Sequence, residues 1–310
     1  PYDLALAVRM HQVVREQGLS ILHVHYAIPH ATSAWIAREM LRESGHDVKV
    51  ITTLHGTDIT LVGQAHAFHT ITKFSIEKSD RVTAVSEFLK SETEMAFGCA
   101  GCDVQVIPNF VDPHVYDRSR WRPDLRESLP AWHKVLMHVS NFRAVKRVRD
   151  VVRVFARVRA TVPATLVMVG DGPDRTDAEE EAHELGVEQD VRFLGRIDRV
   201  APLLASADLF LLPSKTESFG LSALEALATG VPVVASDVGG VSEVVREGET
   251  GFLCRLGDVN AMADAALSVL TNAARWQAMS DAAAADARTR FAIDPIIDQY
   301  QALYRDAVAQ

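Results

Sequence analysis

The stretch PSKTESFGLSALEALATGVPVVAS, residues 213–236, contains a strand end, a polar loop, a helix and a second strand in immediate succession. The first apolar run stops at Pro213. The segment from 219 or 220 to Thr229 predicts a helix that ends at Gly230, because glycine commonly follows the last helical residue. The VPVVAS that follows is typical of a short buried strand. This order of elements is the repeating unit of a parallel sheet covered by helices.

The same alternation continues on both sides of this stretch. Further short apolar runs predict strands at 19–27, 48–56, 81–86, 104–109, 134–140, 164–170, 191–195, 207–214 and 251–254. Amphipathic runs predict helices between the strands, among them 31–44, 66–79 and 146–160. The sequence therefore predicts an α/β fold made of two Rossmann-like domains, each with an open parallel sheet.

Residues 112–134 interrupt the alternation, because this segment is polar, contains three prolines and has no clear period. Such a composition is typical of a linker. We therefore expect an N-terminal domain at 1–130 and a C-terminal domain at 131–294. Pro295 begins a last helix, 295–310, which could pack back on the N-terminal domain. Ligands of open parallel sheets bind at the carboxyl ends of the strands, so two such domains facing each other predict a cleft.

The composition excludes several classes of protein. The 310 residues are 48% hydrophobic and 24% charged, which is the balance of a globular protein. The net charge of -9 is opposite to that of a nucleic-acid-binding protein. No apolar run approaches the roughly 20 residues that a membrane-spanning helix needs, so we expect no integral membrane segment.

The chain has three cysteines, which do not form a disulfide framework and favour a cytoplasmic location. Cys99 and Cys102 form a C-x-x-C pair in a glycine-rich connector, without the second ligand pair of a structural zinc site. An incidental or locally structural role is favoured for this pair over a redox role.

The loop and helix after Pro213 have the chemistry of an anion site. The first amides of a helix have no partner within the helix, so those of Phe219, Gly220 and Leu221 would attract a phosphate. Glu217 precedes the helix and Glu225 lies further along it, so hydroxyl groups on either side of the phosphate could meet a carboxylate. A sugar, a diphosphate and a ribose fit this order. The competing interpretation makes Glu217 a helix cap and Glu225 a solvent-facing residue.

At this point the sequence resembles a known family. ESFGLSALE, from Glu217 to Glu225, is similar to the E-x7-E motif of retaining glycosyltransferases with two Rossmann-like domains, the GT-B fold. Five other stretches resemble the branch of this family that joins N-acetylglucosamine to L-malate, the first step of bacillithiol synthesis. They are HYAIPHA (25–31), TTLHGTDIT (52–60), DRVTAVS (80–86), HVSNFRAVKRV (138–148) and VGDGP (169–173).

The resemblance implies UDP-N-acetylglucosamine as the donor, L-malate as the acceptor, and no metal or other cofactor. Related enzymes are often dimers, so a homodimer is also open. Donor-binding roles fall on residues of the C-terminal domain, namely Asn141, Gly170, Ser218, Phe219, Gly220, Leu221 and Glu225. Glu225 would bind the ribose hydroxyls, and the amides from Phe219 to Leu221 would hold the distal phosphate.

Catalytic roles fall, by the same resemblance, on His55, Arg143, Lys146 and Glu217. Lys146 matches the family's diphosphate-binding lysine, whereas Asn141 stands where the family has an arginine, so Arg143 becomes the nearest substitute. Glu217 would hold hydroxyls of the donor sugar, and His55 matches a residue near its primary hydroxyl.

Acceptor contacts are implied for Tyr26, Thr57 and Lys73. Malate carries two carboxylates, so its site requires at least one cation. Lys73 is the candidate, and a solvated helical lysine is the equally weighted alternative. The expected mechanism is attack on the same face of the sugar, in which the leaving phosphate takes the acceptor's proton.

One departure concerns the beginning of the chain. Family members begin with a strand and a glycine-rich loop that face the acceptor and the diphosphate, and no stretch here matches them. We therefore expect an incomplete N-terminal domain, and weak or no activity without that segment.

Three other functions compete with this interpretation. The first is the same donor chemistry with another acceptor, such as an inositol phosphate or a glycan precursor. The second is a dinucleotide-dependent oxidoreductase, because VGDGP follows a strand, although the full G-x-G-x-x-G and its acidic partner are absent. The third is a non-catalytic protein that binds a sugar nucleotide.

Two side-chain clusters have less specific interpretations. His23 and His25 share one face of a strand and could bind a metal, but no third ligand is evident, so hydrogen bonding is favoured. Arg149, Arg153 and Arg157 share a helix face that could touch a membrane surface, although a plain solvated helix face is favoured because several of these arginines can pair with nearby acids.

Overall fold

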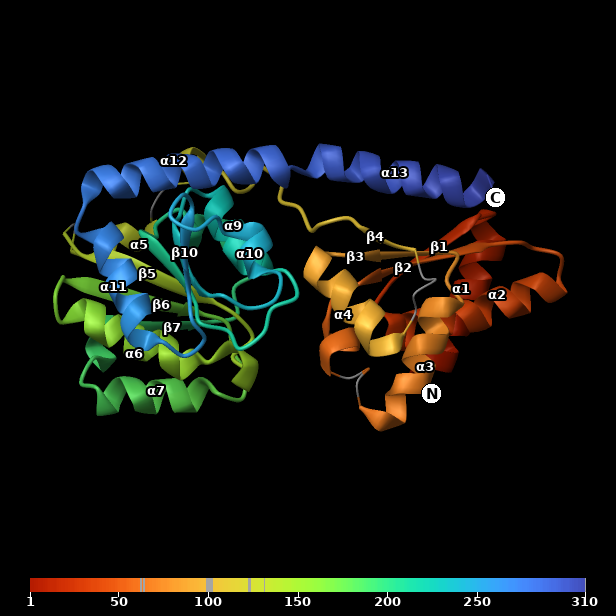
Figure 1. Ribbon diagram of the computed structural model, residues 1–310, viewed down its shortest axis with the longest axis horizontal. Coiled ribbons are helices and arrows are strands. Elements are labelled where there is room, and N and C mark those ends of the chain that lie inside the picture. The colour runs from red at the N-terminus through yellow and green to blue at the C-terminus, as the bar shows by residue number, and fades with distance from the viewer. Residues whose placement is uncertain (62, 64, 99–102, 122–123, 131, 310) are drawn as a thin grey trace. The chain divides into compact units, whose positions relative to one another are not determined.

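The computed structural model describes the whole chain except residues 62, 64, 99–102, 122–123, 131 and 310, so the predictions for Cys99 and Cys102 lie outside the described residues. Two compact units make up the chain (Figure 1). Unit 1 consists of Pro1–Asn109 with Asp294–Gln310, and unit 2 consists of Phe110–Ile293. Each unit contains a parallel sheet with helices packed on it, which confirms the predicted α/β class.

The described residues of unit 1 form a sheet of four strands in the order β1-β2-β3-β4, all parallel. The strands are β1 (Ile21–His25), β2 (Lys49–Leu54), β3 (Arg81–Ala84) and β4 (Val104–Val106). The helices are α1 (Tyr2–Gln17), α2 (Thr32–Glu43), α3 (His66–Glu77), α4 (Glu87–Phe97) and α13 (Ile293–Ala309), with short π-helical turns at η1 (Ala27–Ala31) and η2 (Thr57–Leu61).

The core of unit 1 forms where helices α1 and α2 pack beside each other and against the sheet. Its fully buried side chains include Val14, Leu41, Val48 and Val50. Helix α1 ends at Gly18, whose φ of 62° closes the helix in the left-handed conformation that glycine adopts without strain. Burial of these apolar faces is what holds the helices on the sheet.

The described residues of unit 2 form a sheet of six parallel strands: β5 (Lys134–Val139), β6 (Ala164–Val169), β7 (Val191–Gly195), β8 (Leu209–Leu212), β9 (Val233–Ser236) and β10 (Gly251–Cys254). Its longer helices are α6 (Val148–Arg159), α7 (Arg175–Glu184), α9 (Leu221–Ala228), α11 (Val259–Leu270) and α12 (Ala273–Arg290). Its short helices are η3 (Arg118–Arg120), α5 (Asp124–Glu127), η4 (Ala144–Lys146), η5 (Glu188–Asp190), α8 (Ala201–Leu204) and α10 (Val241–Val244).

The strand order of unit 2 is β10-β9-β8-β5-β6-β7. The chain adds strands in one direction from β5 and then in the other direction from β8, so the order reverses between these two neighbours. They pair in register through Leu136 with Leu209 and Met137 with Phe210. In open α/β sheets, ligands bind beside the carboxyl ends of the strands at such a reversal.

Helix α6 illustrates how the helices of unit 2 are held. Its valines and Phe155 are buried, and it packs beside α7 and α11, while α12 packs beside α9 (Figure 1). On its outer face, Arg149 and Arg153 both donate to the carboxylate of Glu181, at 2.6 and 2.8 Å. These two arginines therefore pair with an acid of α7 while their side chains stay partly exposed, and Arg157 donates to Asn260 at 2.8 Å. No described helix combines the length and the apolar character that a membrane crossing requires.

The boundary between the units lies between Asn109 and Phe110, not at the expected 130 and 131. The polar segment expected to be a linker is held on unit 2 by side chains that no local pattern reveals. Arg118 donates to the carbonyl oxygens of Thr229 and Ala207, and Arg126 donates to that of Ser206. These bonds satisfy backbone oxygens at the ends of α9 and α8, so the segment is part of unit 2.

Candidate functional site

The loops that follow β5 and β8 meet at the reversal of strand order in unit 2. Lys146, in the turn after β5, places its Nζ 2.5 Å from Oε1 of Glu217, in the loop after β8. Ser214 donates from its Oγ to the same carboxylate oxygen at 2.8 Å. Both side chains of the ion pair are mostly buried, with 20% of Lys146 and 11% of Glu217 exposed. Two residues predicted separately as catalytic therefore lie together.

A buried histidine fixes the start of the loop after β5. His138 is fully buried, and its Nδ1 donates to the carbonyl oxygen of Leu211 at 2.8 Å. Burial lowers the pKa of His138 to about 4, so the ring is neutral and its Nε2 accepts from Ser140 Oγ. Ser140 Oγ in turn accepts from the amide of Phe142 at 3.3 Å. This chain of bonds sets the backbone from which Asn141, Arg143 and Lys146 project.

Two glycines allow the turn after β6 to approach the same loop. A Cβ on Gly170, whose φ is 122°, would lie 1.8 Å from the carbonyl oxygen of Ser140. A Cβ on Gly172 would lie 2.0 Å from that of Asn141. Gly170 is thus required for backbone packing, while the exposed side chains of Asn141 and Arg143 remain available to a ligand. Among the described residues, none forms an ion pair with Arg143.

Helix α9 begins beside the loop of Glu217. Gly220 precedes it with a φ of 95° and, as a glycine, has no side chain that could cap its first turn. Phe219 is buried and packs edge-on against Phe291 at a centroid distance of 5.6 Å, whereas Leu221 is exposed. Within the described part of the chain, the amides of Phe219, Gly220 and Leu221 donate to no acceptor. They are therefore free to donate to an anion.

Glu225 lies one turn into α9 and has a partner that the sequence did not indicate. The hydroxyl of Tyr116 donates to its Oε1 at 2.6 Å. Burial raises the pKa of Glu225, and the hydrogen bond from Tyr116 opposes this rise. The carboxylate is thus held in one orientation. Glu225 is only partly exposed, contrary to the solvent-facing interpretation.

The arrangement in unit 2 suits a ligand with a phosphate between two polyols. Two cations, Lys146 and Arg143, and the amides at the start of α9 can neutralise phosphate oxygens. Glu217 and Glu225 can accept hydrogen bonds from hydroxyl groups. The structure thus brings together the donor-side residues predicted from the sequence.

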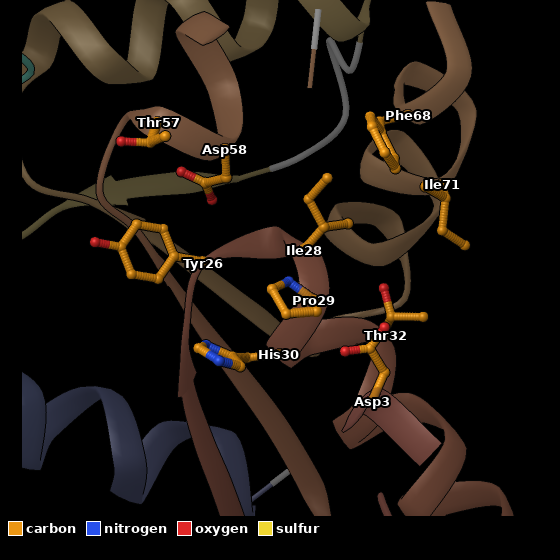
Figure 2. Close-up of a pocket in the computed structure, with 10 residues that line it drawn as sticks. All are labelled: Asp3, Tyr26, Ile28, Pro29, His30, Thr32, Thr57, Asp58, Phe68 and Ile71. Carbon is orange, nitrogen blue, oxygen red and sulfur yellow. The ribbon is translucent and has the colours of Figure 1, made fainter. Parts of the chain in front are cut away.

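Unit 1 contains a separate cavity of about 580 Å³ (Figure 2). It is lined by Asp3, Tyr26, Ile28, Pro29, His30, Thr32, Thr57, Asp58, Phe68 and Ile71. Figure 2 shows Tyr26, Thr57 and Asp58 at one side, and Phe68 and Ile71 of α3 at the other. Asp58 is buried and accepts from the amides of Ala27 and Gly56 at 2.7 and 3.0 Å, which joins the two π-helical turns.

Predicted residues of unit 1 divide between this cavity and its surroundings. Tyr26 and Thr57 line the cavity, and the ring of His55 lies 5.1 Å from that of Tyr26. Lys73 does not line it and lies 3.8 Å from Glu77. Lys73 follows the lining residue Ile71 by two positions, which is about 200° around a helix, so its side chain leaves the opposite face.

Histidines gather at the carboxyl ends of β1 and β2. Nδ1 of His25 lies 2.7 Å from Nε2 of His55, and His23 hydrogen-bonds with Thr53 and with Tyr304 of α13, each at 2.7 Å. Burial, followed by repulsion from neighbouring histidines, lowers the pKa of His23 and of His55 to about 4. No group of three metal-ligating residues occurs among the described residues. Hydrogen bonding thus accounts for His23 and His25.

Three functional candidates were absent from the sequence prediction. Ser214 was detectable in principle, because it is a polar residue at the end of an apolar strand next to the motif. Asp58 lies within LHGTDIT and could have been selected for the same reason. Tyr116 had no local signal, since it stands in a polar segment without a period.

Comparisons with known proteins agree with the geometry. The family described as "Glycosyl transferases group 1" matches residues 133–272, and "Glycosyltransferase Family 4" matches residues 1–115. The chain is 43% identical over 309 residues to N-acetyl-alpha-D-glucosaminyl L-malate synthase of Bacillus anthracis, which covers 99% of this chain and 80% of that protein. It is 32% identical over 250 residues to glycogen synthase of Mycobacterium tuberculosis, covering 77% of this chain and 58% of that protein.

Solved structures show the same fold. The Anabaena protein HepE, in complex with UDP and glucose, superposes with a TM-score of 0.81 at 23% identity, covering 96% of this chain and 80% of that chain. The likeness supports two parallel-sheet domains of the GT-B kind. Together these matches favour the predicted transferase over the oxidoreductase interpretation.

Proposed function

This chain belongs to the GT-B glycosyltransferases, and on that premise we propose that it moves N-acetylglucosamine from UDP to the hydroxyl group of L-malate. The observation that carries this proposal is the 43% identity, over 99% of the chain, to a protein named for that product. The donor-side geometry of unit 2 supports it independently, because its charges and carboxylates fit a sugar nucleotide.

In this proposal unit 2 binds the donor. Lys146, Arg143 and the amides at the start of α9 hold the diphosphate, with Asn141, Gly170 and Ser218 beside them. Glu225 accepts from the ribose hydroxyls. Glu217 accepts from hydroxyls of N-acetylglucosamine, while Lys146 and Ser214 hold its carboxylate in place. A carboxylate forms stronger hydrogen bonds with hydroxyl groups than a neutral acceptor does, so a carboxylate at this position favours sugar binding.

The proposed reaction retains the configuration at the anomeric carbon. The bond from that carbon to the phosphate oxygen breaks, and the acceptor oxygen forms the new bond on the same face of the sugar. The acceptor's proton passes to the departing phosphate. Lys146 and Arg143 stabilise the charge that develops on the diphosphate, so the residues contribute mainly positioning and electrostatics. No step of this proposal requires a metal, and a cytoplasmic location remains a prediction from the cysteine content.

For the acceptor we propose contacts from Tyr26 and Thr57, with His55 near the sugar. The described lining of the unit 1 cavity contains two carboxylates, Asp3 and Asp58, and neither lysine nor arginine. A dicarboxylate needs a cation, so this lining does not by itself select malate. The observation favours testing a second candidate function, transfer of the same sugar to a neutral or phosphorylated polyol such as an inositol phosphate.

The decisive experiment measures UDP binding and UDP release separately. Calorimetry with UDP and UDP-N-acetylglucosamine tests the donor, and UDP release is then followed without acceptor, with L-malate and with inositol phosphate. Release that depends on malate supports the proposal. Release is measured with this chain and with a version extended at its N-terminus. Release with inositol phosphate alone overturns the malate assignment, binding without release by both versions favours a non-catalytic protein, and failure to bind UDP overturns the donor assignment.

A further inference from the structure

Tyr116 makes a short hydrogen bond to one of the two glutamates of the donor site. Its hydroxyl lies 2.6 Å from Oε1 of Glu225, although 109 residues separate them in sequence. Burial, followed by the neighbouring carboxylate, raises the pKa of Tyr116 well above its ordinary value. The phenol therefore keeps its proton at neutral pH and can only donate to this carboxylate.

Hydrogen bonds of neighbouring side chains fix the backbone on both sides of Tyr116. Arg118 donates to the carbonyl oxygen of Thr229, the residue that ends α9, and its guanidinium lies 5.3 Å from the ring of Trp276. Nε1 of Trp121 donates to the carbonyl oxygen of Val115 at 2.7 Å. Tyr116 and Arg118 thus contact α9 at Glu225 and Thr229, one turn apart, so the segment follows one side of the helix that carries Glu225.

This contact limits how Glu225 can meet a ligand. A carboxylate has about four lone-pair positions on two oxygens, and Tyr116 occupies one of them on Oε1. No other donor within the described part of the chain meets this carboxylate, so Oε2 and the second position on Oε1 remain open. Gly220 lies five residues earlier, about 7.5 Å along the helix axis, so the free amides and the Glu225 carboxylate belong to the same short stretch of chain.

We propose that Tyr116 is a positioning residue for ribose recognition: its hydroxyl holds the Glu225 carboxylate in the orientation that accepts the 2′- and 3′-hydroxyls of the nucleotide. The inference rests on the proposed function, since it assumes a nucleotide donor on α9. It assigns part of the donor site to the segment between Phe110 and Trp121. Because the held carboxylate loses little freedom when the ribose binds, Tyr116 favours ribonucleotides over deoxyribonucleotides.

The test compares dissociation constants of UDP and 2′-deoxy-UDP for five forms of the whole chain: wild type, Tyr116→Phe, Glu225→Gln, the double variant with both of these changes, and Tyr304→Phe. Tyr304→Phe is the matched control, because it removes a phenol that makes one 2.7 Å hydrogen bond, to His23 in unit 1. Loss of the bond that orients Glu225 should weaken UDP binding by Tyr116→Phe about tenfold, which corresponds to about 1.4 kcal/mol. Binding of 2′-deoxy-UDP should weaken less than threefold, and the control should change neither constant.

The preference for the ribonucleotide separates positioning from general packing. If Tyr116 only packs the segment against α9, Tyr116→Phe weakens both ligands by the same factor and the inference is overturned. If Tyr116 positions Glu225, Tyr116→Phe reduces the preference for UDP over 2′-deoxy-UDP. In the Glu225→Gln background, Tyr116→Phe then changes this preference no further. Thermal unfolding of each variant checks that the folds are equal. Failure of the wild type to bind UDP at all overturns the proposed function, whereas UDP binding with an unchanged preference overturns the role of Tyr116 alone.

Discussion

Lys146 and Glu217 form an ion pair in which Nζ lies 2.5 Å from Oε1, and the two residues come from loops 71 positions apart in sequence. The pair joins the carboxyl ends of β5 and β8, where the strand order of unit 2 reverses. A cation proposed for phosphate thus touches a carboxylate proposed for sugar. Each of the two residues therefore affects the other's ligand.

Glu217→Gln should separate sugar binding from phosphate binding. The amide no longer holds the charge of Lys146, so we expect UDP to bind as tightly as to the wild type or a fewfold more tightly. The preference for UDP-N-acetylglucosamine over UDP should fall about tenfold, because a charged hydrogen-bond acceptor is lost. Calorimetry with both ligands measures this. Glu179→Gln, which breaks a surface pair with Arg175, is the control and should change neither affinity. Equal weakening of both ligands by Glu217→Gln would contradict the assignment.

Gly170→Ala should destabilise unit 2 and displace the loop that carries Arg143 and Lys146. The new Cβ would lie 1.8 Å from the carbonyl oxygen of Ser140 at a φ of 122°, so backbone must move. We expect the free energy of unfolding to fall by about 3 kcal/mol and UDP affinity to fall with it. Gly186→Ala is the matched control, because its φ is 66° and no atom lies within 4 Å of the added Cβ. Its cost should be about 1 kcal/mol, with UDP affinity unchanged. If urea unfolding shows that the two substitutions lower the free energy of unfolding equally, close backbone packing at Gly170 is not what makes the glycine necessary.

His138 should make the protein less stable in mild acid. Its pKa is about 4 in the folded chain and 6.5 when unfolded, so the unfolded state binds more protons below pH 6.5. The neutral ring of His138 contributes its full share of the free energy of unfolding above pH 6.5. This contribution is lost as the pH falls toward 4, at a limiting slope of about 1.4 kcal/mol per pH unit. His138→Gln should reduce the slope of unfolding free energy against pH over that interval. His23 and His55 contribute in the same direction and remain in the variant. An unchanged slope would show that His138 is not the titrating group.

Substitutions at Tyr26 and Lys73 should distinguish the wall of the unit 1 cavity from the outer face of α3. Tyr26 lines the cavity, so Tyr26→Phe should raise the acceptor KM severalfold without changing the UDP dissociation constant. Lys73 leaves the opposite face and lies near Glu77, so Lys73→Met should leave the acceptor KM within about twofold. Steady-state kinetics with saturating donor measures both. A large KM increase for Lys73→Met would restore Lys73 as the acceptor's cation.

Much of the fold and of the donor site could be predicted because the signals are local. Runs of four to nine residues, mostly apolar, specified the strands, and helical spacing predicted α6, in which Val151, Val152 and Phe155 are buried. The E-x7-E spacing placed Glu217 before a helix and Glu225 within it, since both positions depend only on the turn and helix between them. Boundaries were less exact: the helix expected at 146–160 begins at Val148, because Ala144–Lys146 form a separate 3-10 turn.

The sequence by itself determined the alternating elements, the α/β class and the chemistry of the helix after Pro213, because periodicity and turn residues act over a few positions. Only the tertiary structure decided that Tyr116 holds Glu225, that Arg118 attaches a supposed linker to unit 2, and that Lys73 faces away from the cavity. Those facts depend on which strands become neighbours and on how a helix is rotated against its sheet. Strand order and helix rotation are set by the burial of apolar surface summed over the whole domain. No single stretch of sequence contains this information.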